Sequence, residues 1–336
     1  MMDGIKLDTV TDWLAERIDG LCPPLDFSLI AGGHSNLTYR FSDANKDVYV
    51  LRRPPLGHVL ESAHDMVREH RIISALEGSS VPVPQTRLVC DDISINDAPF
   101  YVMQFVPGSV LHDTAAALSI GAESRRSVGY DVIDILAALH QIDPREVGLG
   151  DLGREHGYIT RQLKRWTSQW EASKTEEIPE MEEVSVLLQE RIPEQIGTSI
   201  VHGDYRLGNM LIEGGRICAI LDWELCTLGD PLADLGYLLN NWILPGEDDL
   251  SNLPTLAGNF PSRADLCDRY EKATGRDLSQ INYYRAFSHW RLAAINQGVY
   301  KRYLVGAMGD RDGELDLDAQ LAGVKSKAST ALDLLS

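Results

Sequence analysis

The chain has 336 residues, of which 44% are hydrophobic and 24% are charged, and its formal net charge is −19. This balance excludes disorder as a description of the whole chain, and the length predicts two lobes or domains. The acidic sum argues against a partner such as duplex nucleic acid, which requires a basic face. No apolar run approaches the ~18 residues of a membrane span. We therefore expect a cytoplasmic protein without a nucleic-acid or membrane partner, and nothing in the sequence indicates an obligate protein partner.

Residues 1–106 predict a β-rich N-terminal lobe that opens with a helix. Apolar residues from Leu7 to Ile18 recur at helical spacing, and Gly20 stands where a helix would stop. Short β-prone runs follow, separated by Gly, Asn and Asp turn signals, which predicts an antiparallel meander. The expected strands span residues 27–33, 37–43, 48–54, 86–92 and 99–106, and a helix is expected over residues 61–78.

From residue 107 to residue 336 the apolar period changes from two to about 3.6, which predicts a mainly helical second lobe. The clearest helices cover residues 127–142, 159–173, 182–193 and 283–304. Residues 209–223, "NMLIEGGRICAILDW", are the exception, because they have the pattern of a hairpin with a Gly-Gly turn. Such a hairpin would bring Asn209 and Asp222 to the same end. The fold class expected is α+β, with lobes at 1–106 and 107–336.

The stretch "HGDYRLGN", residues 202–209, ends where this hairpin starts. Asp204, Asn209 and Asp222 would therefore converge at the edge of a cleft between the two lobes. Carboxylate and amide oxygens suit Mg²⁺, and phosphoryl transfer needs a metal, a cation and a carboxylate that orients the attacking hydroxyl. Each of these residues alone is ordinary for a turn or strand end. Their joint spacing indicates a phosphotransferase, in which Asp204 orients the hydroxyl while Asn209 and Asp222 hold Mg²⁺.

Two hydrolase classes fit the sequence less well. A metal-dependent hydrolase usually uses more His residues and a further ligand pair, and the chain has no H-E-x-x-H motif. A serine hydrolase of the G-x-S-x-G type is disfavoured because that motif is absent from the sequence.

The motif H-G-D-x4-N, the Asp eighteen residues beyond its first Asp in "ILDW", and "GDPLADLGYLL" resemble the aminoglycoside phosphotransferase family, relatives of the eukaryotic-like protein kinases. The resemblance runs from about Phe27 to the last helices. The variants "GGHSNLTYRF", "YVLRRPPLG" and "YITRQLKRWTSQW" resemble in particular the branch that also occurs fused to acyl-CoA dehydrogenases. The resemblance to this family implies a bilobal kinase-like fold. The first lobe would have a small antiparallel sheet and one helix, and the helical second lobe would contain a hairpin.

The resemblance also implies nucleotide-binding residues in the N-terminal lobe. Arg52 stands where kinases carry a phosphate-binding Lys, with Glu69 as its ion-pair partner, although Arg53 competes for this assignment. At the hinge, adenine would bond the backbone of Gln104 and Val106, with Met103 behind it, and either ATP or GTP fits such contacts. The loop over the phosphates would comprise Gly32, Gly33, His34, Ser35 and Asn36, where the glycines allow close backbone approach.

Three further residues are expected to support the site. The resemblance implies that His202 orients the catalytic loop instead of acting as a base, and that Asp234 supports the loop by hydrogen bonding. Asp230, followed by Pro231, has the pattern of a helix N-cap, so a structural role is favoured over metal binding.

The sequence defines the molecule that accepts the phosphate less well than the nucleotide that donates it. The run "TEEIPEMEEV" would suit polycationic aminoglycosides, yet such runs are commonly solvated faces. Arg161, Lys164 and Arg165 lie close together on a predicted helix, and Arg291 and Arg302 recur on a later one. A basic face favours an anionic acceptor such as a hydroxyacyl-CoA, and this is our expectation.

Three alternatives stay open beside it. One is a true aminoglycoside kinase. Another is a non-catalytic nucleotide-binding scaffold, which only the Arg at position 52 supports. A protein kinase is disfavoured, because only eight residues lie between Asp222 and Pro231, too few for an activation segment.

Overall fold

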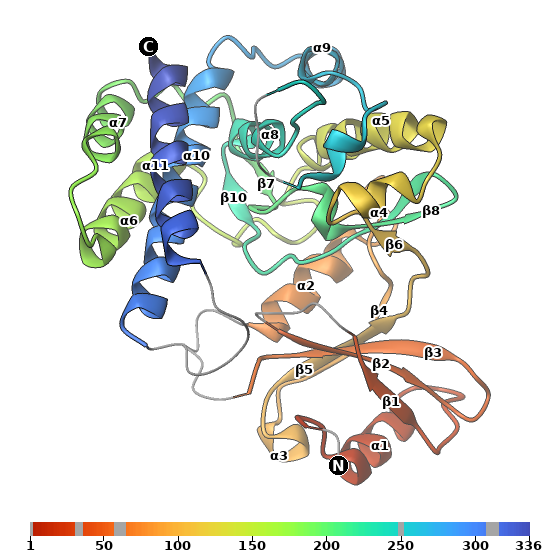
Figure 1. The fold of residues 1–336 in the computed structure, drawn as a ribbon. Coiled ribbons are helices and arrows are strands. Elements are labelled where there is room, and N and C mark those ends of the chain that lie inside the picture. Colours follow the sequence, from red (N-terminus) through yellow and green to blue (C-terminus); the bar gives the residue numbers. More distant parts are fainter. Residues whose placement is uncertain (1–2, 31–35, 57–64, 248–251, 307–315) are drawn as a thin grey trace.

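The computed structural model describes residues 3–30, 36–56, 65–247, 252–306 and 316–336. They form two lobes, with an N-terminal sheet below a larger helical lobe in Figure 1. The chain passes between the lobes in the connection from Gln104 to Ser109. The expected α+β, bilobal kinase-like fold is confirmed, while the expected boundary after Val106 falls in this connection and stays a prediction.

The N-terminal lobe is a five-stranded antiparallel sheet in the order β1-β2-β3-β5-β4. Three helices accompany it, and α2 lies between the sheet and the C-terminal lobe (Figure 1). The elements are α1 (Leu7–Ala15), β1 (Asp26–Leu29), β2 (Leu37–Ser42), β3 (Val48–Arg53), α2 (Met66–Leu76), β4 (Thr86–Cys90), α3 (Ile93–Asn96) and β5 (Phe100–Gln104).

The period of two in β5 divides the apolar residues between two cores. Phe100 and Val102 face a small cluster with Leu14 of α1, whereas Tyr101 and Met103 join the large cluster that continues into the C-terminal lobe. One face of α2 packs against that second side through buried residues that include Ile72. The sheet is therefore covered on both faces, and α2 shares its core with the C-terminal lobe.

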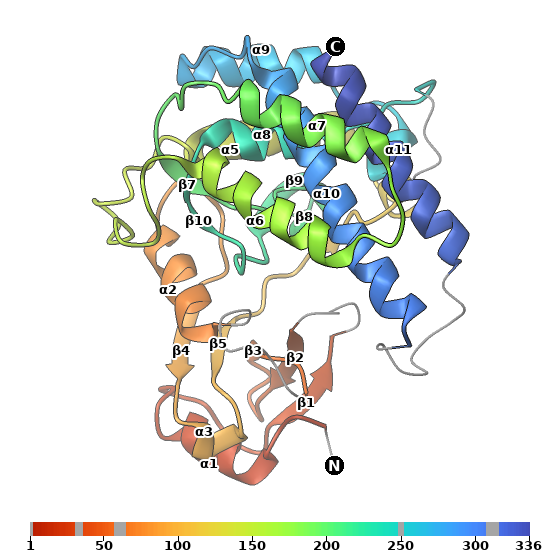
Figure 2. The same ribbon diagram turned by 90° about the vertical axis from the view of Figure 1, so that its left-hand side faces the viewer.

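The C-terminal lobe is built from helices that surround short strand pairs. Helices α10 and α11 run along each other, and α6 and α7 lie beside them (Figure 2). The elements are β6 (Ser109–Val110), α4 (Thr114–Leu118), α5 (Ala122–Leu139), α6 (Tyr158–Ser173), α7 (Pro179–Glu190), β7 (Ser199–Val201), η1 (Leu207–Asn209), β8 (Met210–Glu213), β9 (Arg216–Ile220), β10 (Thr227–Gly229), α8 (Pro231–Asn240), η2 (Pro254–Ala257), α9 (Arg263–Thr274), α10 (Ile281–Leu304) and α11 (Leu317–Leu335). No helix in the described ranges is long and apolar enough to cross a membrane.

The expected hairpin is present as β8 and β9, which pair antiparallel. Its turn residues Gly214 and Gly215 both have positive φ, 58° and 77°, the backbone that a tight two-residue hairpin turn requires. Because Met210 pairs with Ile220, Asn209 and Leu221 are adjacent, and the Leu221 N–H donates to the Asn209 carbonyl at 2.8 Å. The sequence therefore predicted correctly that Asn209 and Asp222 lie at the same end of the hairpin.

Several predicted boundaries differ from the structure. The first strand ends at Leu29, and the helix expected over residues 61–78 is described only as α2, which begins at Met66. Asp65 is its N-cap, because the Asp65 carboxylate accepts a hydrogen bond from the Arg68 N–H. Residues 61–64 lie outside the described residues, so that part of the prediction is not addressed.

Helices α8 and α10 approach each other closely at Gly236. A Cβ added at Gly236 would lie 2.8 Å from the backbone carbonyl carbon of Tyr284, so the two backbones leave no room for a side chain. This contact places α10 directly over α8.

We predict that Gly236→Ala destabilises the protein by about 1–3 kcal/mol, because the new methyl group must push two packed backbones apart. The control is Gly323→Ala on α11, where the nearest atom to the added Cβ among the described residues is Lys327 Nζ, the tip of a flexible side chain, at 4.0 Å. This control should gain up to about 1 kcal/mol from helix propensity. Urea unfolding of both variants measures the difference, and equal stabilities would contradict this packing argument.

Candidate active site

The loop after β7 is held in place by the first turns of α8. The buried Asp234 carboxylate accepts hydrogen bonds from the His202 N–H at 2.6 Å and the Gly203 N–H at 2.9 Å. Burial raises the pKa of Asp234, but contacts with His140 and His202 and the backbone hydrogen bond outweigh it, so the pKa lies below its usual value. Asp234 is therefore a charged anchor that fixes the backbone immediately before Asp204.

His202 links this loop to the end of β9. Its Nδ1 accepts a hydrogen bond from the Asp204 N–H at 3.2 Å, so Nε2 carries the ring proton and donates to the Leu221 carbonyl at 3.0 Å. The ring is buried and packs at 4.6 Å from the ring of Trp223. Both ring nitrogens are thus engaged with the backbone on either side of the site, and the expected role of His202 in orienting the loop stays a prediction.

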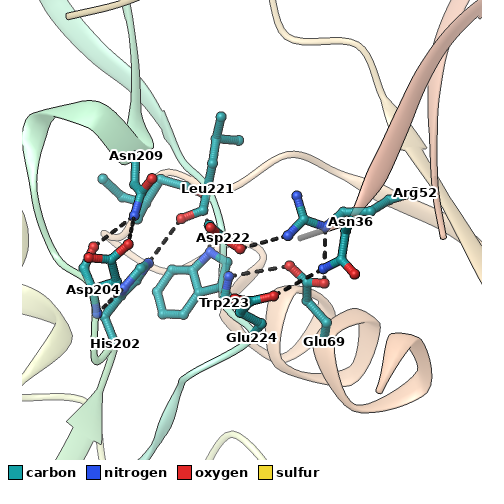
Figure 3. Close-up of polar contacts among 11 residues, drawn as sticks. Asn36, Arg52, Glu69, His202, Asp204, Asn209, Leu221, Asp222, Trp223 and Glu224 are labelled. Atoms are coloured by element: carbon teal, nitrogen blue, oxygen red, sulfur yellow. Dashed lines mark hydrogen bonds and ion pairs between the residues drawn. The ribbon is translucent and has the colours of Figure 1, made fainter. Parts of the chain in front are cut away.

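Asp204 and Asn209 form a bonded pair across the loop, on the left in Figure 3. The Asn209 amide nitrogen donates to the Asp204 carbonyl at 2.8 Å and to its carboxylate Oδ2 at 2.7 Å. Because the amide nitrogen is used in this way, Asn209 Oδ1 is available, and it accepts no hydrogen bond from the described residues. The Asp204 carboxylate and the Asn209 amide are therefore held next to each other.

Asp222 follows β9 with a φ of 66°, in the left-handed region that few residues other than Gly adopt. Strained backbone of this kind is typical of functional sites. The Asp222 carboxylate points across to the N-terminal lobe, where its Oδ1 pairs with Arg52 Nη2 at 2.6 Å (Figure 3). Asp222 therefore faces the N-terminal lobe, and its predicted role as a metal ligand stays a prediction.

Arg52 also pairs with Glu69 of α2, with 3.2 Å between Arg52 Nε and Glu69 Oε2. The Glu69 side chain is only 2% exposed and that of Arg52 14%. Burial raises the pKa of Glu69, and the Arg52 guanidinium opposes the rise. The Trp223 N–H donates to the other Glu69 oxygen at 3.3 Å. One guanidinium and one carboxylate thus connect β3, α2 and the residues after β9.

Arg53, the competing assignment, points elsewhere. It is buried and donates to the backbone carbonyls of Gly4, Pro54 and Asn96 in the N-terminal lobe. The geometry therefore brings Arg52, and not Arg53, to the site.

The oxygen atoms available as metal ligands fit an Mg²⁺ ion that is bound together with a nucleotide. No group of three or more His, Cys, Asp or Glu side chains suited to hold a metal on its own occurs in the described part of the chain. Mg²⁺ usually takes one or two protein carboxylates and completes its shell with phosphate and water oxygens. Asn209 Oδ1 and the Asp222 carboxylate are such a partial set.

Glu224 is a site residue that the sequence analysis missed. Its Oε2 accepts a hydrogen bond from the Asn36 amide at 3.1 Å, which joins the start of β2 to the C-terminal lobe. Burial, and then the charge of Asp222, raise the pKa of Glu224 to about 7. Its position two residues after Asp222 was the only available sequence signal. Of the expected phosphate loop, Asn36 is buried at this contact, while Gly32, Gly33, His34 and Ser35 lie outside the described residues.

The backbone between β5 and β6 is only partly engaged in hydrogen bonds with the described residues. The Phe105 N–H donates to the Val48 carbonyl at 3.3 Å and the Gln104 N–H to the Gln85 carbonyl at 2.8 Å. The Val106 N–H has no hydrogen-bond partner among the described residues. Met103 is buried within the core shared by α2 and the C-terminal lobe. The predicted nucleotide contacts of Met103, Gln104 and Val106 stay predictions.

Asp230 lies at the N-cap of α8, where its carboxylate accepts from the Leu232 N–H at 3.1 Å and from the Tyr284 hydroxyl at 2.7 Å. Both Asp230 oxygens are thus used to hold α8 and α10 together. This geometry agrees with a structural role and not with metal binding.

The predicted acceptor residues do not contact Asp204. Arg161 donates to the carbonyls of Arg154 and His156 in the preceding loop, and Arg165 lies over the ring of Trp166 at 5.0 Å. Lys164 and Arg302 are exposed on α6 and α10. Helices α6 and α10 pack against each other in the C-terminal lobe (Figure 2). An acceptor role for the four residues stays a prediction.

A protein with this bilobal fold, and with a loop and hairpin that meet between the lobes, is of the kinase-like phosphotransferase class. The model of the phosphotransferase enzyme family (APH) matches residues 26–264. The chain belongs to this family, as the sequence motifs predicted.

Curated relatives contain a similar segment within longer chains. Acyl-CoA dehydrogenase family member 10 of Mus musculus is 38% identical over 297 residues, which is 84% of this chain and 27% of that protein. Acyl-CoA dehydrogenase family member 11 of Gallus gallus is 36% identical over 82% of this chain and 36% of its own length. The chain thus spans about a third of these relatives, and it resembles the branch that the sequence indicated.

Solved structures agree with this assignment. A "putative aminoglycoside phosphotransferase" from Ralstonia eutropha has a TM-score of 0.83 and 34% identity, and the match covers 98% of this chain and 97% of that one. The aminoglycoside phosphotransferase APH(4)-Ia, solved with ADP and hygromycin B, has a TM-score of 0.62 at 15% identity, with 92% and 94% covered, and therefore shows the fold alone.

We predict that Arg52→Met destabilises the protein by about 3–5 kcal/mol, because it leaves the Glu69 carboxylate buried without its cation. Arg52→Lys should lose less, since it keeps the charge but not the two-sided guanidinium geometry. Arg87→Met, an exposed arginine in β4 of the same sheet, is the control and should change stability by less than about 0.5 kcal/mol. Urea unfolding of the metal-free protein gives the three values. Equal losses for Arg52→Met and Arg87→Met would contradict the role of the pair.

Proposed function

We propose that this protein transfers the terminal phosphate of ATP to a hydroxyl of a small molecule, with Mg²⁺. The observation that carries the proposal is the convergence of Asp204, Asn209 and Asp222 at the end of one hairpin, opposite the Arg52 guanidinium. Phosphoryl transfer requires positioning and charge stabilisation more than covalent chemistry by the protein, and these groups supply both. Solved members of the fold contain ADP or AMP-PNP, which supports an adenine nucleotide, while GTP remains a second donor to test.

In this proposal each residue has one task. The Asp204 carboxylate accepts the proton of the acceptor hydroxyl and orients its oxygen, a general-base role. Arg52, fixed by Glu69, contacts phosphate oxygens, and the hinge backbone of Gln104 and Val106 binds the purine. Asn209 and Asp222 would hold Mg²⁺, which when bound offsets the charge on the phosphates.

We propose an anionic acceptor of the hydroxyacyl-CoA type. The relatives named acyl-CoA dehydrogenases support this chemistry, because a domain in the same chain commonly handles a related compound. The acidic run that would suit an aminoglycoside is partly engaged elsewhere: Glu176 pairs with Lys325 at 2.6 Å, and Glu182 accepts from the Trp170 indole at 3.0 Å. The aminoglycoside kinase stays the first alternative, supported by the names of the solved structures.

A non-catalytic scaffold is the second alternative, and the site geometry weighs against it. The bonds from Asn209 to Asp204, and from Asp234 to the loop, fix the Asp204 carboxylate and the Asn209 amide in position, which supports a catalytic role. A scaffold that only binds a nucleotide does not require this loop arrangement.

The test is Mg²⁺-dependent phosphate transfer from ATP to two acceptor sets, hydroxyacyl-CoA thioesters and aminoglycosides. We expect turnover with the thioesters, and a loss of about 10²–10⁴-fold in kcat for Asp204→Asn, the range for removal of a general base. Asp268→Asn, an exposed aspartate on α9, is the matched control and should keep full activity. Turnover with aminoglycosides alone would overturn the anionic acceptor, and tight ATP binding without any transfer would favour the scaffold.

A further inference from the structure

The Asp204 carboxylate is held by donors on both of its oxygens. Asn209 donates to Oδ2 at 2.7 Å, and the hydroxyl of Tyr237, a residue of α8, donates to Oδ1 at 2.5 Å. Arg206 Nε lies 3.4 Å from the same Oδ1. A carboxylate bonded from both sides cannot rotate freely, so the direction of its remaining lone pairs is set by Asn209 and Tyr237 together.

Tyr237 reaches this position because it lies three residues after Asp234 in α8. Residues at this spacing share a helix face, so the same face that binds the loop backbone through Asp234 also presents the Tyr237 hydroxyl to Asp204. Tyr237 is 7% exposed, and burial, followed by the nearby charge of Asp204, raises its pKa well above the usual value. The phenol therefore keeps its proton and always acts as donor.

Arg291 of α10 holds Tyr237 from the other side. Its guanidinium carbon lies 5.3 Å from the centre of the Tyr237 ring, within the range of a cation–π contact. Arg291 Nη2 donates to the Gly203 carbonyl at 3.3 Å, while its Nε is buried and has no hydrogen-bond partner among the described residues. A buried cation with so few partners is costly, which argues that its place beside Tyr237 and the loop serves the site.

We propose that Tyr237 is a positioning residue for Asp204, and that Arg291 fixes the Tyr237 ring for this task. This inference rests on the proposed function, in which Asp204 orients the acceptor hydroxyl. In the free enzyme the carboxylate is then already aligned, so that no rotation of Asp204 is needed when the acceptor binds.

The alternative is that the Tyr237 hydroxyl only stabilises the fold. Tyr283→Phe is a matched control for it, because Tyr283 is also buried and its hydroxyl donates to a backbone carbonyl, that of Leu188, at 2.8 Å. Both variants remove a hydroxyl from a buried tyrosine. The hydroxyl of Tyr237 is bonded to Asp204, and that of Tyr283 is bonded to helix α7.

The experiment measures steady-state kinetics of Tyr237→Phe, Tyr283→Phe, Arg291→Lys and Asp204→Asn in the full chain. The acceptor is the best hydroxyacyl-CoA or aminoglycoside of the panel, or water if hydrolysis of ATP is the only turnover. We expect Tyr237→Phe to lower kcat by about 10- to 100-fold, the loss for a hydrogen bond to a charged group, with the KM for ATP unchanged. Arg291→Lys should lower kcat in the same direction but less, and Tyr283→Phe should leave it unchanged.

The outcomes separate this inference from the proposed function. Equal kcat values for Tyr237→Phe and Tyr283→Phe, with Asp204→Asn inactive, overturn only the positioning role. Full activity of Asp204→Asn, or no turnover of any kind by the unsubstituted enzyme, overturns the proposed function and this inference with it. If Tyr237→Phe is poorly folded, Arg291→Lys decides the matter, because Arg291 is proposed to act through the Tyr237 ring. A lowered kcat with an unchanged KM for ATP then supports the positioning role, and an unchanged kcat overturns it.

Discussion

The site depends on two ion pairs made by one guanidinium, that of Arg52. It binds a buried carboxylate of α2 on one side and Asp222 after β9 on the other, so a single cation joins both lobes. Glu69 could not remain buried and charged without this partner. The backbone N–H of Trp223 adds a second link between α2 and the C-terminal lobe. The position of Asp222, and with it the predicted metal site, is therefore coupled to the position of α2.

A second constraint acts on the opposite side of the cleft. Helix α8 fixes the loop around Asp204 through Asp234, and α10, which packs closely on α8 at Gly236, contributes Arg291. The close packing of two core helices thus determines the surroundings of the carboxylate that we assign as the base. Arg52 in the N-terminal lobe fixes Asp222, and Asp234 in the C-terminal lobe fixes the loop of Asp204. Each therefore positions one of the acidic groups to which we assign a role in phosphoryl transfer.

Much of this could be predicted from the sequence, because the information is local. The Gly-Gly turn identifies the hairpin and places Asn209 and Asp222 at the same end, whereas the register shift between Leu211 and Ile212 has no signal in the sequence. Glu224 and Tyr237 were missed, since their roles depend on contacts between segments far apart in the chain, although Tyr237 stands at helical spacing from Asp234 in "DLGY". The contacts of Arg161 with the carbonyls of the preceding loop were likewise not foreseen from its basic spacing, and its acceptor role stays a prediction.

The central claim is that Asp222 is a metal-binding residue held in place by Arg52. The most direct measurement is the affinity for AMP-PNP by isothermal titration, with and without Mg²⁺, for the unsubstituted protein and for Asp222→Asn. We predict that Mg²⁺ strengthens binding to the unsubstituted protein, and that Asp222→Asn loses this gain while it keeps the metal-free affinity. An Asp222→Asn protein with an undiminished Mg²⁺ effect would contradict the account.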